Sequence, residues 1–390
     1  MQKVIDEMKV LFVINAFDAP SGAEHVLLDY LKTEKRIIPG FLIIGPHSES
    51  QDLFTQVTER KNIFYIHASN QIQSLLSRFF LFKAYRYMLC IKVKENDIYK
   101  KLNSKRDFDV IYYNNSFESM TFYPLFPGAK KVIHIHDMID MFRPAQKRCI
   151  VSVCRKAKQI IAVSEACSQM LSKNGIDPSK ISVVHNSIDI EPQAYIAKQS
   201  DALVIGFVGS VIHRKGFDLY VDILNGVDNE IKKRQQGVRS VKALIITNSH
   251  KDSEFLRANI NRLNEDIEKN EYYSIPRKEV LSLYPDMDIL VVPSRFDPLP
   301  TVVLESYLSG TPVIGTAKDG MLEMQTEKQM MFDINDVDCA IRRILDWADL
   351  SEDRKKELVS NTQKYIQSEF TAENKRERVY SVLQKTVNGE

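Results

Sequence analysis

The sequence has little of what marks a membrane-spanning or secreted protein. No apolar run reaches about 18 residues, the length that a spanning helix needs. The N-terminal segment carries Asp6 and Glu7 and lacks an apolar stretch of signal-peptide length, so we expect no secretion. Cysteine is also scarce. An odd number of cysteines without the paired spacing of a zinc site indicates reduced thiols of the cytosol: Cys90, Cys149, Cys154, Cys167 and Cys339.

The sequence has almost no excess charge of either sign. Its 53 basic and 51 acidic residues leave a net charge of +2, so overall charge gives no reason to expect a nucleic-acid partner. The contents of hydrophobic (44%) and charged (27%) residues are those of an ordinary globular protein. At 390 residues, the length favours two or three domains.

Short apolar segments alternate with helical segments along the chain, which predicts parallel sheets with helices on both faces. The polar stretch Ile190–Asp201 separates two series of expected strands. The first series is Lys9–Asn15, Phe41–Gly45, Asn62–His67, Asp109–Asn114, Lys131–His136, Gln159–Val163 and Ile181–His185. The second is Leu203–Gly209, Lys242–Thr247, Asp288–Val292, Thr311–Gly315 and Met330–Asp333.

We therefore expect an α/β protein of two domains, residues 1–188 and 189–365, with a cleft between them as the default ligand site. A charged tail from about residue 351 looks helical. Its last part, residues 366–390, is expected either to be a solvated helix or to pack back on the first domain.

The segment VVPSRFDPLPTVVLESYLSGTPVIGTAKDG, residues 291–320, is the most informative of the chain. It predicts a strand, a polar loop, a helix over Thr301–Leu308 capped by Gly310, and another strand. Asp297 lies in the loop and Glu305 in the helix. Because ligands of open α/β sheets bind at the carboxyl ends of strands, these carboxylates are candidates for binding sugar or ribose hydroxyls.

The segment GFVGSVIHRKGFDLY opens the second series with a strand, a cationic loop and a helix. Arg214 and Lys215 follow the strand directly and suit a diphosphate, although a solvated loop would also carry such a pair. The segment matches neither the GxGxxG fingerprint nor the GxxxxGK[ST] loop, which argues against nicotinamide dehydrogenases and P-loop NTPases.

Three further segments carry candidate contacts, each with an ordinary structural alternative. Gly22 ends the turn Asp18–Gly22 before a helix over Ala23–Leu31, and it suits either an anion site or a plain turn. A strand end carries His134, His136 and Asp137, which suit either a hydrogen bond to substrate or an ordinary structural role. The two histidines could also form a zinc pair, but no pattern of a third ligand accompanies them. Asn186 and Asn248 each follow a strand and suit a ligand contact or a turn.

The stretch from Arg60 to Lys94 holds no acid and interleaves cations with aromatic residues. Its cations are Arg60, Lys61, Arg78, Lys83, Arg86, Lys92 and Lys94, and its aromatic residues include Phe79, Phe80, Phe82, Tyr85 and Tyr87. Such a segment suits the interface of an anionic bilayer. A pair of core helices with cations facing water is an equal alternative.

Taken together, these segments resemble the retaining glycosyltransferases of the GT-B fold in the GT4 family, also called glycosyl transferases group 1. The resemblance covers nearly the whole chain and is most specific in PSRFDPLPTVVLESYLSGTPVIGT, where the family has a Glu-x7-Glu pair. Here the first acid is shortened to Asp297. The resemblance implies that Glu305 binds the nucleotide ribose and that Asp297, Leu299 and Thr301 contact the donor sugar.

The remaining motifs are matched in part. The family lysine that binds the donor diphosphate falls on Lys215, while Ser210 replaces the usual arginine, and we infer that Arg214 supplies the missing charge. The family's strand-end histidine, near the reaction centre, best matches His136. Gly22 matches the Gly-Gly-x-Glu loop in which Ser21 departs, and Asn186 opens a turn like the family's NGVD. In the GG-x-x-E turn Gly320 and Glu323 match and Asp319 departs.

The resemblance implies an enzyme that moves a sugar from a nucleoside diphosphate sugar, UDP- or GDP-linked, to a glycan or lipid-linked acceptor. The catalytic residues would be His136, Arg214, Lys215 and Asp297, and the substrate-binding residues Gly22, Ser210, Asn248, Leu299, Thr301 and Glu305. No metal or cofactor is expected. We expect a cytoplasmic protein of bacterial surface polysaccharide synthesis, with the inner face of the membrane as a further expected contact. A catalytically impaired sugar-nucleotide-binding protein and a GT-B nucleotide-sugar epimerase are the alternatives.

Overall fold

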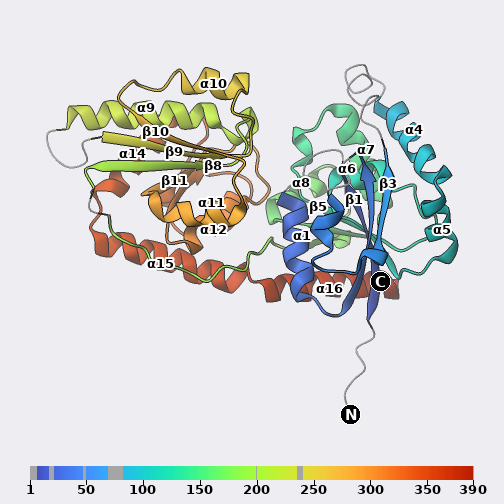
Figure 1. Cartoon of the computed structure of the whole chain (residues 1–390). Helices are drawn as coiled ribbons and strands as arrows, with labels where there is room; N and C mark the ends of the chain where they lie inside the picture. Colours follow the sequence, from blue (N-terminus) through green and yellow to red (C-terminus); the bar gives the residue numbers. More distant parts are fainter. Residues whose placement is uncertain are drawn as a thin grey trace, which may run out of the picture. The chain divides into compact units, whose positions relative to one another are not determined.

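The computed structural model describes residues 7–16, 22–46, 50–68, 82–198, 200–234 and 240–389 (Figure 1). The chain divides into two compact units, Met1–Ser187 together with Ala372–Glu390, and Ile188–Thr371. The turn expected at residues 18–21 and the aromatic-basic residues Arg78, Phe79 and Phe80 lie outside the described residues.

The first unit is built on a seven-stranded parallel sheet in the order β3-β2-β1-β4-β5-β6-β7. Its central strands are buried on both faces, as apolar runs of parallel sheets are. The strands are β1 (Met8–Asn15), β2 (Ile37–Gly45), β3 (Ile63–His67), β4 (Val110–Tyr113), β5 (Lys131–Ile135), β6 (Gln159–Ala162) and β7 (Ile181–Val183).

Helices cover both faces of this sheet. They are α1 (Gly22–Thr33), α2 (Ser50–Phe54), α4 (Phe82–Glu95), α5 (Asp97–Lys105), α6 (Ser116–Phe122), α7 (Pro144–Lys156), α8 (Glu165–Lys173) and α16 (Ala372–Asn388). Alternate residues of β1 enter opposite core clusters, because successive side chains of a strand point to opposite faces. Leu11 and Val13 pack with residues of α4 and α7, and Phe12 packs with residues of α1 and α16.

The second unit contains a six-stranded parallel sheet in the order β10-β9-β8-β11-β12-β13. Its strands are β8 (Ala202–Val208), β9 (Ser240–Thr247), β10 (Glu268–Tyr273), β11 (Ile289–Val292), β12 (Val313–Thr316) and β13 (Met331–Phe332). Its helices are α9 (Phe217–Lys233), α10 (Glu254–Ile260), α11 (Arg277–Leu283), α12 (Thr301–Leu308), α13 (Met321–Met324), α14 (Val337–Asp349) and α15 (Glu352–Glu369).

The prediction of two parallel-sheet α/β domains is confirmed, with two differences of detail. Strand β10 was not expected, because its sequence EKNEYY is polar and lies exposed at the edge of the sheet. Helix α15 continues to Glu369, so the second unit extends beyond the end expected at residue 365.

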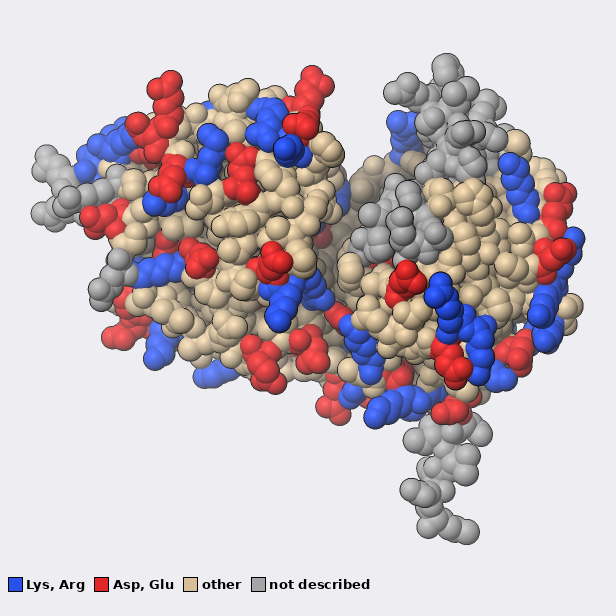
Figure 2. All heavy atoms as spheres, in the orientation of Figure 1, with Lys and Arg blue, Asp and Glu red and all other residues tan. Residues whose placement is uncertain are grey.

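The last helix packs on the first unit, since Val379, Val382 and Leu383 of α16 join the core cluster of Phe12. Within the part of the chain that the structure describes, no helix combines the length and the apolar character that crossing a bilayer requires. Acidic and basic side chains are interspersed over the visible face (Figure 2), as the small net charge leads one to expect.

Helix α16 also buries a charge-bearing side chain against α1. Lys375 is 4% exposed, and its Nζ donates to the carbonyl oxygen of Val26 at 3.1 Å. Burial lowers the pKa of Lys375 to about 7. An unfolded lysine titrates near pH 10.4, so between about pH 7 and about pH 10 the unfolded chain binds a proton that the folded chain lacks.

We therefore expect the free energy of unfolding of the first unit to rise with pH between about 7 and about 10, and Lys375→Met to remove this increment. Chemical denaturation at a series of pH values measures it. Lys385→Met, on the exposed face of the same helix, serves as the control and should leave the pH dependence unchanged. Equal pH dependence in the wild type and Lys375→Met would contradict the assignment.

Candidate functional site

Loops from neighbouring strands of the second unit meet at the carboxyl ends of β8, β11 and β12, where open α/β sheets bind ligands. Two glycines allow the backbones to touch. A Cβ atom on Gly216, after β8, would lie 1.9 Å from the carbonyl oxygen of Pro293, after β11. A Cβ atom on Gly320, after β12, would lie 2.0 Å from the carbonyl oxygen of Pro298. Side chains carried by these loops are therefore held close together.

The turn after β8 presents Lys215 at the start of α9. Residues His213–Lys215 form a short 3-10 helix, and Gly216 has φ 72° and ψ 30°, a left-handed conformation that glycine adopts at little cost. The Lys215 Nζ lies 2.5 Å from Oδ2 of Asp297, and the Asp297 carboxylate is almost buried. Two residues predicted from separate motifs thus form one ion pair.

The loop after β12 supports Asp297. The backbone N–H of Asp297 donates to Oδ2 of Asp319 at 3.3 Å, and Gly320 N–H donates to the carbonyl oxygen of Asp297 at 3.1 Å. Asp319 has φ 50°, a left-handed conformation that Asp tolerates better than most residues. A left-handed conformation favours glycine, which the family turn has at this position, and aspartate is one of the residues that can replace it.

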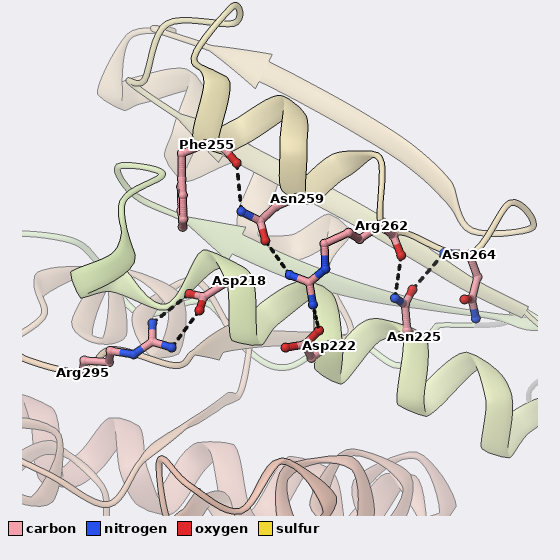
Figure 3. A network of polar contacts seen from close by, with 8 residues as sticks. All are labelled: Asp218, Asp222, Asn225, Phe255, Asn259, Arg262, Asn264 and Arg295. Atoms are coloured by element: carbon pink, nitrogen blue, oxygen red, sulfur yellow. Dashed lines mark hydrogen bonds and ion pairs between the residues drawn. The ribbon is translucent and has the colours of Figure 1, made fainter.

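Arg214 contacts the loop after β11. Its Nη1 donates to the carbonyl oxygen of Phe296 at 2.9 Å, so the guanidinium joins the turn to the loop after β11. Arg295, which the sequence gave no reason to select, donates from the same loop to His213 O at 2.7 Å and forms a forked pair with Asp218 at 2.8 and 2.7 Å (Figure 3).

Glu305 is fixed at both oxygens. It lies in α12, is 7% exposed, and accepts from Arg277 Nε at 3.0 Å on Oε1 and from the Tyr284 hydroxyl at 3.0 Å on Oε2. Arg277 is the first residue of α11, the helix that follows the unexpected strand β10. Burial, together with the neighbouring carboxylate of Glu305, raises the pKa of Tyr284 well above its usual value. The hydroxyl therefore stays protonated and continues to donate.

The remaining predicted residues of this unit lie on the same edge of the sheet. Ser210 Oγ donates to Asn248 Oδ1 at 2.8 Å, which joins the ends of β8 and β9. Leu299 is buried in the loop after β11, and Thr301 is the first residue of α12 and half-buried.

In the first unit, His136 directly follows β5. Its ring lies 3.9 Å from the ring of His134, whose Nδ1 is 2.7 Å from the Tyr112 hydroxyl. Burial lowers the pKa of His136 to about 3, so the imidazole is neutral at neutral pH. Among the described residues, its buried Nε2 has no hydrogen-bond partner. Gly22, another predicted residue of this unit, opens α1.

Sequence reasoning missed a buried acid at the carboxyl end of β1, because a lone glutamate in SFES matches no pattern. Glu118 of α6 is 1% exposed and accepts from the backbone N–H of Asn15 at 3.0 Å, at the carboxyl end of β1. Burial and the nearby Glu24 raise the pKa of Glu118 to about 8, so it is mainly protonated at neutral pH. Within the described ranges, no group of three or more His, Cys, Asp or Glu side chains is arranged to hold a metal ion.

We expect Gly320→Ala to destabilise the second unit, because the added Cβ must displace the backbone at Pro298. Overpacking of this kind costs about 1–3 kcal/mol, and urea denaturation measures it. The control is Gly22→Ala in the first unit, where the added Cβ would meet nothing within 4 Å among the described residues. Unchanged stability in Gly320→Ala would show that the two loops are not in contact.

Comparisons with known proteins identify the family of the chain. The family model described as "Glycosyl transferases group 1" matches residues 202–349, and "Glycosyltransferase Family 4" matches residues 63–192. A Klebsiella pneumoniae protein, described as an uncharacterized 41.2 kDa protein in the cps region, is 27% identical over 297 residues, covering 70% of this chain and 72% of that protein.

Solved structures show the same fold. Anabaena HepE in complex with UDP and glucose matches with a TM-score of 0.72 and 18% identity over 97% of this chain and 100% of its own. Sucrose-phosphate synthase from Thermosynechococcus elongatus matches with a TM-score of 0.72 and 13% identity over 98% of this chain and 100% of its own.

A third structure is S. aureus TarM in complex with fondaparinux, α-GlcNAc-glycerol and UDP. It matches with a TM-score of 0.70 and 10% identity over 96% of this chain and 99% of its own. The resemblance predicted from the sequence is confirmed: the chain belongs to the GT4-type glycosyltransferases and has their GT-B fold.

Proposed function

We propose that the protein transfers a sugar, with retention of anomeric configuration, from a UDP- or GDP-sugar to a glycan or lipid-linked acceptor in bacterial surface polysaccharide synthesis. The observation that carries the proposal is the ion pair of Lys215 with Asp297 at the carboxyl ends of the adjacent strands β8 and β11, with Glu305 in the helix that follows β11. The complexes of HepE with UDP and glucose, and the position of the Klebsiella relative in a cps region, support the donor and the pathway.

In this proposal Glu305 binds the ribose hydroxyls and Lys215 binds the diphosphate. Arg277 and Tyr284 hold the Glu305 carboxylate in one orientation, which lowers the entropy lost on binding. Lys215 stands at the N-terminus of α9, whose partial positive charge adds to its own. Stabilising the departing diphosphate requires preorganised positive charge, and neither a metal nor a cofactor is proposed.

Asp297 is proposed to contact the donor sugar together with Leu299 and Thr301. Its carboxylate is shared with Lys215, so a diphosphate arriving at Lys215 would compete for the same ammonium group. Ser210 and Asn248 line the neighbouring strand ends. His136 of the first unit would offer a neutral imidazole for a hydrogen bond to substrate. Gly22, at the start of the helix that follows β1, is proposed as a further substrate contact. An anionic membrane is proposed as a further contact of that unit.

A thermal-shift screen of UDP-, GDP-, ADP- and dTDP-sugars tests the donor assignment. A ligand at 100 times its dissociation constant should stabilise the folded protein by about 2.7 kcal/mol. We expect a uridine or guanosine donor to give the largest shift. Absence of any shift would contradict the proposal, and binding without turnover of donor would favour the impaired sugar-nucleotide-binding alternative.

We expect Lys215→Ala to lower kcat about 100-fold to 1000-fold, as loss of one preorganised contact to developing charge does. Steady-state release of nucleoside diphosphate in the presence of acceptor measures it. Lys233→Ala, at the exposed far end of the same helix, is the control and should keep its activity. Near-normal turnover by Lys215→Ala would remove the diphosphate role.

Asp297→Glu restores the acid that the family usually carries. We expect it to retain activity if the carboxylate contacts the donor sugar, because one added methylene still allows both that contact and the pair with Lys215. The same nucleotide-release measurement applies. Complete loss of activity would show that the site is built around the shorter side chain.

A further inference from the structure

Arg295, in the loop after β11, donates two hydrogen bonds to the turn after β8. Its backbone N–H donates to Arg214 O at 2.8 Å, and its Nη1 donates to His213 O at 2.7 Å. These carbonyls belong to the two residues immediately before Lys215. Two residues after Arg295, Asp297 pairs with the Lys215 ammonium.

The guanidinium of Arg295 also holds the first turn of α9. Its Nη1 and Nη2 donate to the two carboxylate oxygens of Asp218 at 2.8 and 2.7 Å, a forked geometry that fixes orientation as well as distance (Figure 3). The side chains are 20% and 21% exposed. Burial tends to raise the pKa of Asp218, but the hydrogen bonds and charge of Arg295 outweigh it and the pKa is lowered.

A guanidinium whose two Nη groups both donate to protein acceptors has less to offer a phosphate than the Lys215 ammonium, which has three N–H donors and pairs with one carboxylate oxygen of Asp297. Asp218 compensates the charge of Arg295, and the guanidinium is further committed to the carbonyl of His213. Its contacts instead bind the turn from both sides, through the backbone before Lys215 and through the helix after it. We infer that Arg295, with Asp218, is a positioning residue that holds Lys215 in place for the departing diphosphate, an inference that rests on the proposed function.

The same helix offers a matched control. One turn farther along α9, Asp222 pairs with Arg262. The Nη1 of Arg262 also donates to Asn259 Oδ1 at 2.8 Å (Figure 3). Both pairs join an arginine from elsewhere in the unit to an aspartate of α9. Only the pair with Arg295 contacts the residues next to Lys215.

The first arm of the test needs no ligand. The N–H groups of Lys215 and Gly216 donate to Ile212 O at 3.0 Å and His213 O at 3.1 Å, so their hydrogen exchange reports on the turn. We expect Arg295→Met and Asp218→Asn to speed this exchange about tenfold, and Arg262→Met to leave it unchanged. Equal exchange in Arg295→Met and the wild type would overturn the positioning role.

The second arm measures UDP affinity by calorimetry in two backgrounds. Arg295→Met should weaken UDP binding about tenfold in the wild type and by less than about twofold in the Lys215→Ala background, because a residue that acts through Lys215 loses its effect with it. Arg295→Lys, which keeps the charge without the fork, should fall between. Equal weakening in both backgrounds would overturn the inference by showing that Arg295 contacts the nucleotide itself.

The two arms separate this inference from the proposed function. If the wild type binds neither UDP nor GDP, the donor assignment fails, while hydrogen exchange still decides whether Arg295 holds the turn.

Discussion

The loop after β11 and the turn after β8 hold each other in place, and the candidate site depends on this contact. The backbones approach so closely that only glycine fits at position 216, and Gly320 allows the same close approach between the loops after β12 and β11. Hydrogen bonds then cross the contact in both directions, from Arg214 to Phe296 O and from Arg295 to His213 O. A turn that carries a cation and a loop that carries a carboxylate become one rigid surface at the carboxyl edge of the sheet.

Charge in this surface is balanced pair by pair. Asp297 faces Lys215, Glu305 faces Arg277, and Asp218 faces Arg295. Pairing lets the carboxylates lie almost buried without the cost of an isolated buried charge. The three cations then have two different roles. Arg277 and Arg295 hold carboxylates of the protein, whereas Lys215 is the cation that a diphosphate could share with Asp297. A shortened acid at position 297 fits this arrangement, because the pair with Lys215 forms at 2.5 Å with the aspartate that is present.

Much of the fold was predictable because it follows from local apolar periodicity. The helix Thr301–Leu308, the alternating strands and the GT4 relationship could all be predicted from the sequence. Strand β10 could not, because an exposed edge strand needs no apolar pattern. Nor could the partners Arg277, Arg295 and Asp218, since pairing between residues far apart in the chain is set by tertiary packing. Glu118 was missed for the same reason. Its pKa is raised by burial, and the residues next to it in the sequence do not indicate that it is buried.

A structure of the protein with bound UDP, or with GDP if that gives the larger thermal shift, tests the central claim most directly. The account predicts that the diphosphate oxygens lie within hydrogen-bonding distance of Lys215 Nζ and that the ribose hydroxyls contact the Glu305 carboxylate, with Arg295 still paired to Asp218. A nucleotide bound away from the carboxyl ends of β8, β11 and β12, with no contact to Lys215 or Glu305, would contradict it.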